Sequence, residues 1–421
     1  MMLKRSISSL LDQVLLSALN FGIAFALIQG ISKSEYGLYV QLWLFGLLAT
    51  SIADALLGNA FNILNNRPVE ERPNHLLLNS FRLSLGIAGV AAVLGAAFSL
   101  WLTQEWTSWT DRLGLLCVYV CYLLVLVTRE FKRVCFYLTE RWQRALIMDA
   151  VFACSAVSGL AAFWWAGWLS VTTVFVALTV ASGVAFLHAP KFDEDRAPLA
   201  IKHITDLARK TWALSGWALP GTVVGWAINN VYLFLLSEML GSAATAEANA
   251  SKLAIMPLAL TLVAWYQISR ADIARLAQSG DDVAYKRFVR KSFVWMYVPL
   301  LAYLPAFTLV YPWIEPLLTK RGYTHMDTLI MWWFVSAAVA PLKFFGTSLL
   351  VGFEAFKPLF KLSVLSLVVQ SLGVLLAGNF FGLLYVVPAL IVADLLEAAL
   401  MWGLLLPRAM RAKVVAASQP G

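Results

Sequence analysis

Long apolar runs, separated by short clusters of charged and turn-forming residues, follow one another along the whole chain of 421 residues. An α-helix needs about 20 mostly apolar residues to cross the hydrocarbon layer of a membrane, because each residue adds about 1.5 Å. Most of the runs are close to this length or longer. The pattern predicts twelve membrane-spanning helices, at residues 10–30, 36–64, 80–102, 113–128, 145–165, 168–188, 212–237, 245–268, 292–314, 327–352, 362–378 and 383–406.

The composition agrees with this pattern. Apolar residues make up 60% of the chain and charged residues 13%, and the mean hydropathy is +0.74. A soluble protein of this size could not cover so much apolar surface with polar side chains. We therefore expect an all-α polytopic membrane protein, because a helix satisfies its own backbone hydrogen bonds inside the bilayer.

The positively charged side chains indicate the orientation. If the N-terminus is cytoplasmic, nearly all Lys and Arg residues outside the runs fall on the cytoplasmic side, where such residues are retained. The exceptions are Lys33, Arg112, Lys320 and Arg321. This sidedness accounts for the net charge of +8 without a nucleic-acid partner. It predicts a multi-pass protein with both termini in the cytoplasm, whose first run stays as a helix and is not cleaved.

A charged segment in the middle divides the chain into two halves of six runs each. We predict an N-terminal six-helix bundle at residues 1–190, a cytoplasmic linker at 191–211, a C-terminal six-helix bundle at 212–407 and a cytoplasmic tail at 408–421. Since each half has an even number of spans, both halves have the same orientation, and an axis along the membrane normal should relate them. We expect an amphipathic surface helix within the linker and another within the segment 269–292.

The sequence gives little support for catalysis. The connections on the outer side are short, and the chain contains no G-x-x-x-x-G-K-[ST], H-E-x-x-H or G-x-S-x-G motif. The four histidines are scattered, which argues against a metal site, and the four cysteines lie in or beside the fourth and fifth runs, which argues against a disulfide. We expect a protein that is not an enzyme and has no catalytic residues, metal or cofactor.

Several short stretches resemble a known family. They are Leu11-Asp12-Gln13 with Ser17-Ala18-Leu19-Asn20-Phe21, then Ser34-Glu35-Tyr36-Gly37-Leu38-Tyr39, and in the second half Ala248-Asn249-Ala250-Ser251-Lys252-Leu253-Ala254. They resemble the first residues and the eighth helix of the polysaccharide transporter family, the Wzx-type flippases of the multidrug/oligosaccharidyl-lipid/polysaccharide exporter superfamily. One departure is in the seventh helix, where many relatives carry an Asp and this chain reads Tyr232-Leu233-Phe234, so no role of that acid is carried over.

The resemblance implies a MATE-like fold, with two six-helix bundles around a central cavity that opens alternately to each side of a bacterial inner membrane. It also implies a flippase that moves an oligosaccharide linked to undecaprenyl pyrophosphate outward, for the export of a polysaccharide. The implied partners are the lipid-linked oligosaccharide, membrane lipids and other glycan-assembly proteins.

Charged side chains inside the runs are the main candidates for a site, because each costs about 3 kcal/mol on insertion scales unless it is paired or hydrated. Lys252 follows small residues in the eighth run, and Lys343 follows Pro341 in the tenth. Two such ammonium groups in a cavity could bind a pyrophosphate and release it again. The alternatives are that Lys343 forms a structural ion pair with Asp394 or Glu397, and that Lys252 extends to the outer interface.

Asp394 and Glu397 share one face of the last run, because they are three residues apart. Two carboxylates placed in this way disfavour joint ionisation, which would create a proton-binding site for ion coupling. The alternative is that Lys343 or neighbouring polar groups satisfy them. Asp54 and Asn59 in the second run could contact sugar hydroxyls, or could form hydrogen bonds between helices.

The remaining candidates are amides and arginines. Asn20 in the first run and Asn229 with Asn230 in the seventh lie about half the chain apart, as in a duplicated unit, and could bind substrate. Arg129 and Arg133, at the inner ends of spans three to five, could attract a pyrophosphate headgroup. The same two arginines also fit the general excess of cytoplasmic positive charge.

The sequence therefore favours a lipid-linked oligosaccharide flippase that works by alternating access. One alternative is a drug or small-molecule exporter of the same superfamily. Another is a membrane-embedded glycan polymerase or ligase, which the short outer loops disfavour. A sugar transporter of the major-facilitator type is a third, but the loop Asn65–Asn74 lacks the Gly-Asp-Arg-Gly-Arg pattern expected there.

Overall fold

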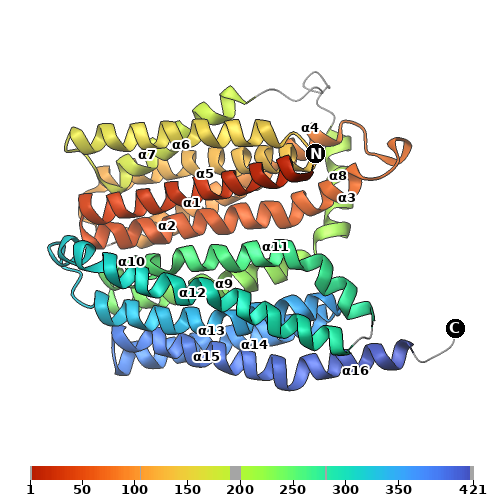
Figure 1. Cartoon of the computed structure of the whole chain (residues 1–421). Helices are drawn as coiled ribbons and strands as arrows, with labels where there is room; N and C mark the ends of the chain where they lie inside the picture. Colours follow the sequence, from red (N-terminus) through yellow and green to blue (C-terminus); the bar gives the residue numbers. More distant parts are fainter. Residues whose placement is uncertain (1, 105, 190–200, 280–281, 418–421) are drawn as a thin grey trace. The chain divides into compact units, whose positions relative to one another are not determined.

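The computed structural model describes residues 2–104, 106–189, 201–279 and 282–417. Within these ranges the chain is helical apart from short connections, and it contains no strand (Figure 1). Eleven helical segments of the described part are long and apolar enough to cross a membrane, and Leu15–Gly30 is a shorter apolar helix. Each of the twelve predicted runs coincides with one of these segments, which confirms the prediction of an all-α polytopic membrane protein.

The chain forms two compact units, Met1–Val223 and Val224–Gly421. The helices of the first unit are α1 (Met2–Gly30), α2 (Lys33–Ala53), the π-helix η1 (Asp54–Gly58), α3 (Asn59–Asn65), the 3₁₀-helix η2 (Val69–Glu71), α4 (Leu76–Leu102), α5 (Trp109–Leu138), α6 (Trp142–Trp165), α7 (Val171–His188) and α8 (Ile201–Ser215).

In the first unit, α5 is the central helix and contacts α2, α4, α6 and α7. Its side chains Leu115, Tyr119 and Leu123 recur every four residues, so they form one stripe of the helix, and all three are buried. The Tyr119 hydroxyl donates a hydrogen bond of 2.8 Å to the carbonyl oxygen of Leu42 in α2. Gly95 lets α4 approach closely, because a Cβ there would collide with Leu123.

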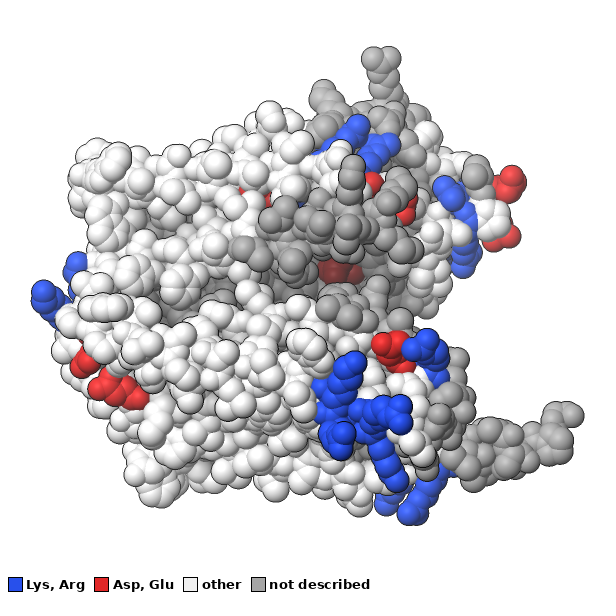
Figure 2. Space-filling model, viewed as in Figure 1, with Lys and Arg blue, Asp and Glu red and all other residues white. Residues whose placement is uncertain are grey.

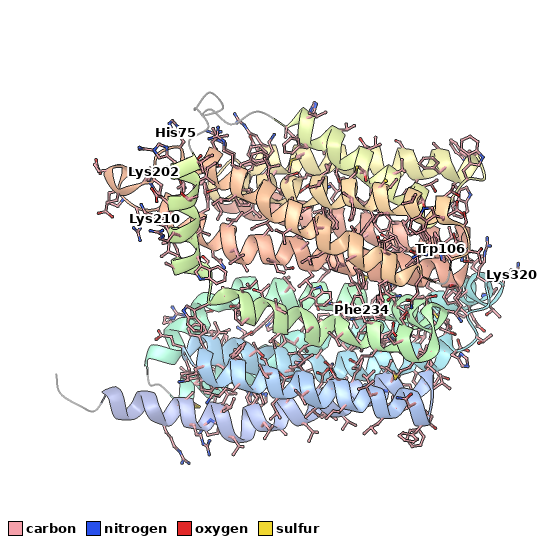
Figure 3. All side chains as sticks on the ribbon, turned by 180° about the vertical axis from the view of Figure 1, so that it is seen from behind. His75, Trp106, Lys202, Lys210, Phe234 and Lys320 are labelled. Atoms are coloured by element: carbon pink, nitrogen blue, oxygen red, sulfur yellow. The ribbon has the colours of Figure 1, made fainter. Side chains whose placement is uncertain are left out.

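The helix α8 has the amphipathic character that the sequence predicts for this region. Its Leu207 is buried in a cluster with Phe61, Leu64 and Leu76 of the first unit, and α8 lies across the ends of the neighbouring helices (Figure 1). Lys202 and Lys210 on the same helix are exposed (Figure 3).

The seventh predicted span begins later than its hydropathy indicates. Residues 212–215 belong to α8, and a turn follows in which the Gly216 N–H donates to Trp212 O at 2.8 Å. The membrane-length helix α9 therefore starts at Ala218 instead of residue 212. Of the predicted linker, residues 191–200 lie outside the described residues, as do residues 418–421 of the predicted tail.

Most of α9 (Ala218–Leu240) lies in the second unit, which begins at Val224. The further helices of this unit are α10 (Ser242–Lys252), η3 (Leu253–Ile255), α11 (Met256–Ser279), α12 (Asp282–Thr319), α13 (Met326–Gly352), α14 (Phe356–Phe380), η4 (Leu383–Tyr385), α15 (Val386–Leu400), the π-helix η5 (Met401–Leu405) and α16 (Leu406–Ala417).

The helix α13 is central in the second unit and contacts α10, α11, α12, α14 and α15. Its fully buried Phe345 packs edge-to-face on Trp265 and Phe293, with ring centroids 5.1 and 5.2 Å away. Such aromatic pairs add about 0.5–1.5 kcal/mol each beyond the area they bury. A Cβ on Gly346 would collide with Met401, so this glycine lets α13 and η5 come close together.

The separate surface helix predicted within the segment 269–292 is not formed. Most of this segment instead extends its two neighbours, since α11 continues to Ser279 and α12 begins at Asp282. The prediction was wrong because the polar residues there continue the helices beyond the apolar spans without a break.

Four short segments inside the spans depart from α-helical hydrogen bonding, and three of them lie close to charged residues. The π-helix η1 begins at Asp54, the 3₁₀-helix η3 directly follows Lys252, and the π-helix η5 begins four residues after Glu397. Short π-helical segments occur frequently at functional sites. Each of the three thus lies at or near a charged residue that the sequence analysis selected.

Candidate functional site

A group of charged side chains in the first unit lies around η1 and α5. At the start of η1, Asp54 is exposed, and a Cβ on Gly58 would collide with its carboxylate oxygen Oδ1. Glycine at this position leaves room for the Asp54 carboxylate to lie along the helix. A cleft of about 290 Å³ opens beside it, and its polar lining consists of Thr50, Ser51, Asp54, Glu130, Arg133 and Tyr137.

An ion network of α5 and α6 forms one wall of this cleft. The Arg133 guanidinium lies 2.7 Å from a Glu130 oxygen and 2.9 Å from an oxygen of Asp149, which is fully buried. Arg129 also forms an ion pair with Glu130, and its guanidinium lies 3.7 Å from the centre of the Phe152 ring. Because the Arg129 side chain is only 4% exposed, Arg133 is the arginine of this pair that lines the cleft.

Lys132, next to these arginines, has a different role. Its ammonium donates hydrogen bonds of 3.2 Å to Phe186 O and 3.1 Å to Ala189 O, at the C-terminal end of α7. A cation at this end of a helix satisfies carbonyl groups that have no partner within the helix and offsets the negative end of the helix dipole. The basic run of α5 is therefore divided between internal packing and the cleft.

In the second unit, Lys252 lies between aromatic rings. Its ammonium is 5.2 Å from the centre of the Tyr232 ring and 5.4 Å from that of Trp333, and it donates a hydrogen bond of 3.4 Å to Asn229 O. The indole N–H of Trp333 in turn donates to Ser251 Oγ at 3.0 Å, which orients the ring. Within the described part of the chain, no carboxylate lies within ion-pair distance of Lys252.

Lys343 forms an ion cluster with the two acids of the last span. Its ammonium lies 2.7 Å from Asp394 and 2.8 Å from Glu397. The Ser366 hydroxyl of α14 donates a hydrogen bond of 2.6 Å to Glu397. The ion pair that the sequence left open as an alternative is thus present, while substrate binding by Lys343 and ion coupling by Asp394 and Glu397 stay predictions.

The asparagines of the spans mostly donate to their own helices. The side-chain amide of Asn229 donates to Gly225 O at 2.8 Å, that of Asn230 to Trp226 O at 2.9 Å, and that of Asn59 to Ala55 O at 3.1 Å. Asn20 on α1 is exposed, as are Asn59 and Asn229. Asn229 is joined to another candidate, because its backbone oxygen accepts a hydrogen bond from Lys252.

Several residues of these arrangements escaped the sequence analysis as site residues, and four of them show why. Glu130 stands within a run of basic residues, although its spacing to Arg133 fits an i, i+3 ion pair. Tyr232 and Trp333 look like ordinary apolar residues of their spans, and Ser366 like one of many hydroxyls. Their roles depend on contacts between helices, for which the sequence pattern carries no signal.

The contact of Tyr232 with Lys252 lies where this chain departs from the family that its sequence resembles. Tyr232 begins the stretch in which many members of the resembled family carry an acid, and in this chain the ring of a tyrosine faces the cation.

A Gly58→Ala substitution tests the role of the cleft in the first unit. We expect it to lower transport several-fold, because the added methyl group must displace the Asp54 carboxylate.

The control for this prediction is Gly89→Ala in α4, where an added Cβ meets no atom within 4 Å. Transport into proteoliposomes by purified protein is the measurement. In an Asp54→Ala background, Gly58→Ala should cost nothing further. Equal losses in both backgrounds would mean that the methyl group acts by another route.

Taken together, the helices and the charged residues within them define a class: an all-α, multi-pass membrane protein. Comparison with family models and with curated protein sequences gives no match. Comparison with solved structures gives matches along nearly the whole chain. The described fold is similar to the folds of solved MATE transporters and of the lipid II flippase MurJ.

Three of these solved structures illustrate the likeness. One is an inward-facing multidrug resistance MATE family transporter of the MOP superfamily, with a TM-score of 0.65 and 15% identity over 94% of this chain and 96% of that one. Another is a MOP superfamily transporter from Pyrococcus furiosus, with a TM-score of 0.64 and 13% identity over 97% and 96%. The third is the lipid II flippase MurJ, with a TM-score of 0.71 and 12% identity over 98% and 91%.

Proposed function

We propose that this chain is a flippase of the MOP superfamily that moves an oligosaccharide linked to undecaprenyl pyrophosphate outward across a bacterial inner membrane, for polysaccharide export. Its fold supports a transporter, and its likeness to MurJ, which is named for lipid II, supports a lipid-linked substrate. We propose no chemical reaction for it. The single observation that carries the proposal is the environment of Lys252.

The Lys252 ammonium is held by ring faces and one carbonyl oxygen, which are weak partners for a full charge. A cation–π contact contributes about 0.5–2 kcal/mol, whereas a hydrogen bond between an ammonium and a phosphate oxygen is charge-assisted and stronger. A pyrophosphate can therefore replace the rings as the partner of Lys252. When it leaves, the rings stabilise the ammonium again, which favours release as well as binding.

The cleft beside η1 in the first unit has a lining that suits sugar hydroxyls. Its lining offers the hydroxyls of Thr50 and Ser51 and the carboxylate of Asp54. Hydroxyl and carboxylate oxygens accept hydrogen bonds from sugar hydroxyls, and Arg133 adds donors. Asn20 and Asn59, both exposed on the same unit, are further proposed contacts with sugar.

The charge distribution supports the proposed orientation. Figure 2 shows Lys and Arg side chains gathered over one end of the second unit, and Lys320 lies at the other end (Figure 3). Positively charged residues are retained on the cytoplasmic side. We propose that the richly basic end is cytoplasmic, that both termini lie there, and that membrane lipids and other glycan-assembly proteins are partners.

A flipping assay tests the proposed function. Purified protein is placed in liposomes with a fluorescent oligosaccharide on undecaprenyl pyrophosphate, and a membrane-impermeant reagent reports which leaflet holds the label. We expect exchange between leaflets in liposomes with the protein and none in liposomes without it. Absence of exchange over a panel of such glycans would reject the proposal.

The cluster of Asp394, Glu397 and Lys343 is the proposed site of ion coupling. We expect Asp394→Asn combined with Glu397→Gln to make flipping insensitive to an imposed pH gradient, because the amides cannot bind or release a proton. The control pair is Glu70→Gln with Glu71→Gln, two acids in the loop after α3. If the doubly substituted protein still responds to the gradient as the unchanged protein does, these acids do not couple protons.

A second candidate is a small-molecule exporter, which the likeness to multidrug MATE transporters favours. The two candidates differ in what they move. Efflux of fluorescent cationic dyes from cells that express the chain, together with no flipping of the pyrophosphate-linked glycan, would support the exporter.

A further inference from the structure

A second hollow lies in the second unit and shares no residue with the Lys252 site or the Lys343 cluster. It is a groove of about 360 Å³ between α14 and the segment formed by η5 and α16. Three cationic side chains line it, those of Lys357, Lys361 and Arg408, and the rest of its lining is leucine and proline. Nothing in the proposed transport path uses this groove.

The cations and the leucines occupy different depths of the groove. On α14, Lys357, Lys361 and Leu365 are spaced four residues apart, so they follow one another along one face at steps of about 6 Å. On the facing segment, Leu404 lies one turn before Arg408. The charged groups therefore lie at the end of the helices, and the apolar wall continues from them into the span.

The positive charges of this groove are not neutralised by acidic side chains in its lining. Its lining includes no acidic side chain, and among the described residues none of the three cations forms an ion pair. All three are exposed. Like charges held close together repel one another, so an anion that enters between them is stabilised by all three at once.

We propose that this groove binds an anionic glycerophospholipid, with its phosphodiester among Lys357, Lys361 and Arg408 and an acyl chain along Leu365 and Leu404. Basic pockets between helices at the cytoplasmic face bind anionic lipid headgroups, and the apolar wall matches the chain that such a headgroup carries. A zwitterionic lipid fits this groove less well, because it offers no net charge to the three cations. A free phosphate also fits less well, because it leaves the leucine wall without a partner.

Native mass spectrometry of the full-length, delipidated protein tests this site, with dioleoylphosphatidylglycerol as the ligand and dioleoylphosphatidylethanolamine as its zwitterionic counterpart. We expect one tightly bound phosphatidylglycerol. The triple substitution Lys357→Ala, Lys361→Ala and Arg408→Ala should weaken it roughly 100-fold, because each cation near an anionic lipid contributes a factor of about 5.

The matched control is Lys286→Ala, Arg290→Ala and Lys291→Ala. It removes the same charges from exposed positions of α12, at the same end of the unit, and should leave the affinity unchanged. Leu404→Trp, which fills the groove without changing charge, should weaken binding as well. These three results together support the site.

Several results would overturn it. Equal losses in both triple variants would mean that the lipid follows overall charge, and no loss in either would mean that it binds elsewhere. Equal binding of phosphatidylethanolamine, or displacement of the lipid by inorganic phosphate at the same concentration, would reject a phospholipid site. Preference for undecaprenyl pyrophosphate over phosphatidylglycerol would assign the groove to the carrier lipid instead.

Discussion

Replacing Lys252 with Ala is expected to abolish export of the glycan while the protein still inserts and folds. The substitution removes the cation between Tyr232 and Trp333 and so leaves no fixed charge there for a pyrophosphate. It leaves no acid without a partner, since no carboxylate of the described chain is paired with Lys252. Flipping in proteoliposomes should fall below detection, and the lipid-linked sugar should accumulate on the inner leaflet of cells.

The control is Lys320→Ala, which removes the same charge from an exposed position after α12. We expect it to flip substrate at the unchanged rate. Lys252→Arg should retain partial activity, because a guanidinium keeps the charge but binds phosphate as a planar, two-pronged donor that releases it less readily. Export by Lys252→Ala at the unchanged rate would remove this residue from the site.

Replacing Lys343 with Ala is expected to destabilise the protein strongly. The substitution leaves Asp394 and Glu397 side by side without their cation, and the Glu397 side chain is only 3% exposed. Breaking a buried ion pair by removing one partner costs about 3–5 kcal/mol. We expect a lower yield of purified protein and a clearly lower midpoint of thermal unfolding, measured by size-exclusion chromatography after heating.

Removing all three charges should reverse most of this effect. In Lys343→Met with Asp394→Asn and Glu397→Gln, no uncompensated charge is left in this cluster, and such neutral replacements are often tolerated. A triple variant no more stable than Lys343→Ala would show that the ion cluster does not account for the loss. Flipping by a stable triple variant would further separate the structural role of Lys343 from a role in binding.

The spans were predictable because hydropathy and helix length are local properties of the sequence. The errors occurred where local pattern and tertiary packing differ. Residues 212–215 are apolar enough to extend the seventh span, yet they belong to α8, whose Leu207 packs on Phe61 and Leu64. The polar residues around 269–292 suggested a separate helix, yet they extend α11 and α12.

The candidate site was predictable to the extent that charge in a span is itself a signal. This signal identified Lys252, Lys343, Asp394 and Glu397, and the spacing of the two acids already suggested an ion cluster. It did not reveal that Trp333, more than 80 residues further along the chain, contacts Lys252. Aromatic residues are common throughout the spans, so their direction depends on helix packing.

For the arginines of α5, the sequence grouped residues that the structure separates. Their position in a basic run suggested either a shared role at a cavity mouth or the general excess of cytoplasmic positive charge, but burial and partners separate them. Arg129 is paired with Glu130 and covered by Phe152, whereas Arg133 reaches the cleft beside Asp54. Arg129 and Arg133 are four residues apart and so lie on one face of α5, but they are one turn apart along the helix and meet different neighbours.

The charges of Lys252, Lys343 and the two acids of the last span balance one another. Two ammonium groups stand against the two carboxylates of Asp394 and Glu397, and Asp394 interacts electrostatically with Lys252 as well as with Lys343. In the proposed function, an arriving pyrophosphate leaves this balanced set with surplus negative charge in a medium of low dielectric constant. A cation that enters with the cargo reduces this surplus, so that binding of the cargo and binding of that cation favour each other by thermodynamic linkage.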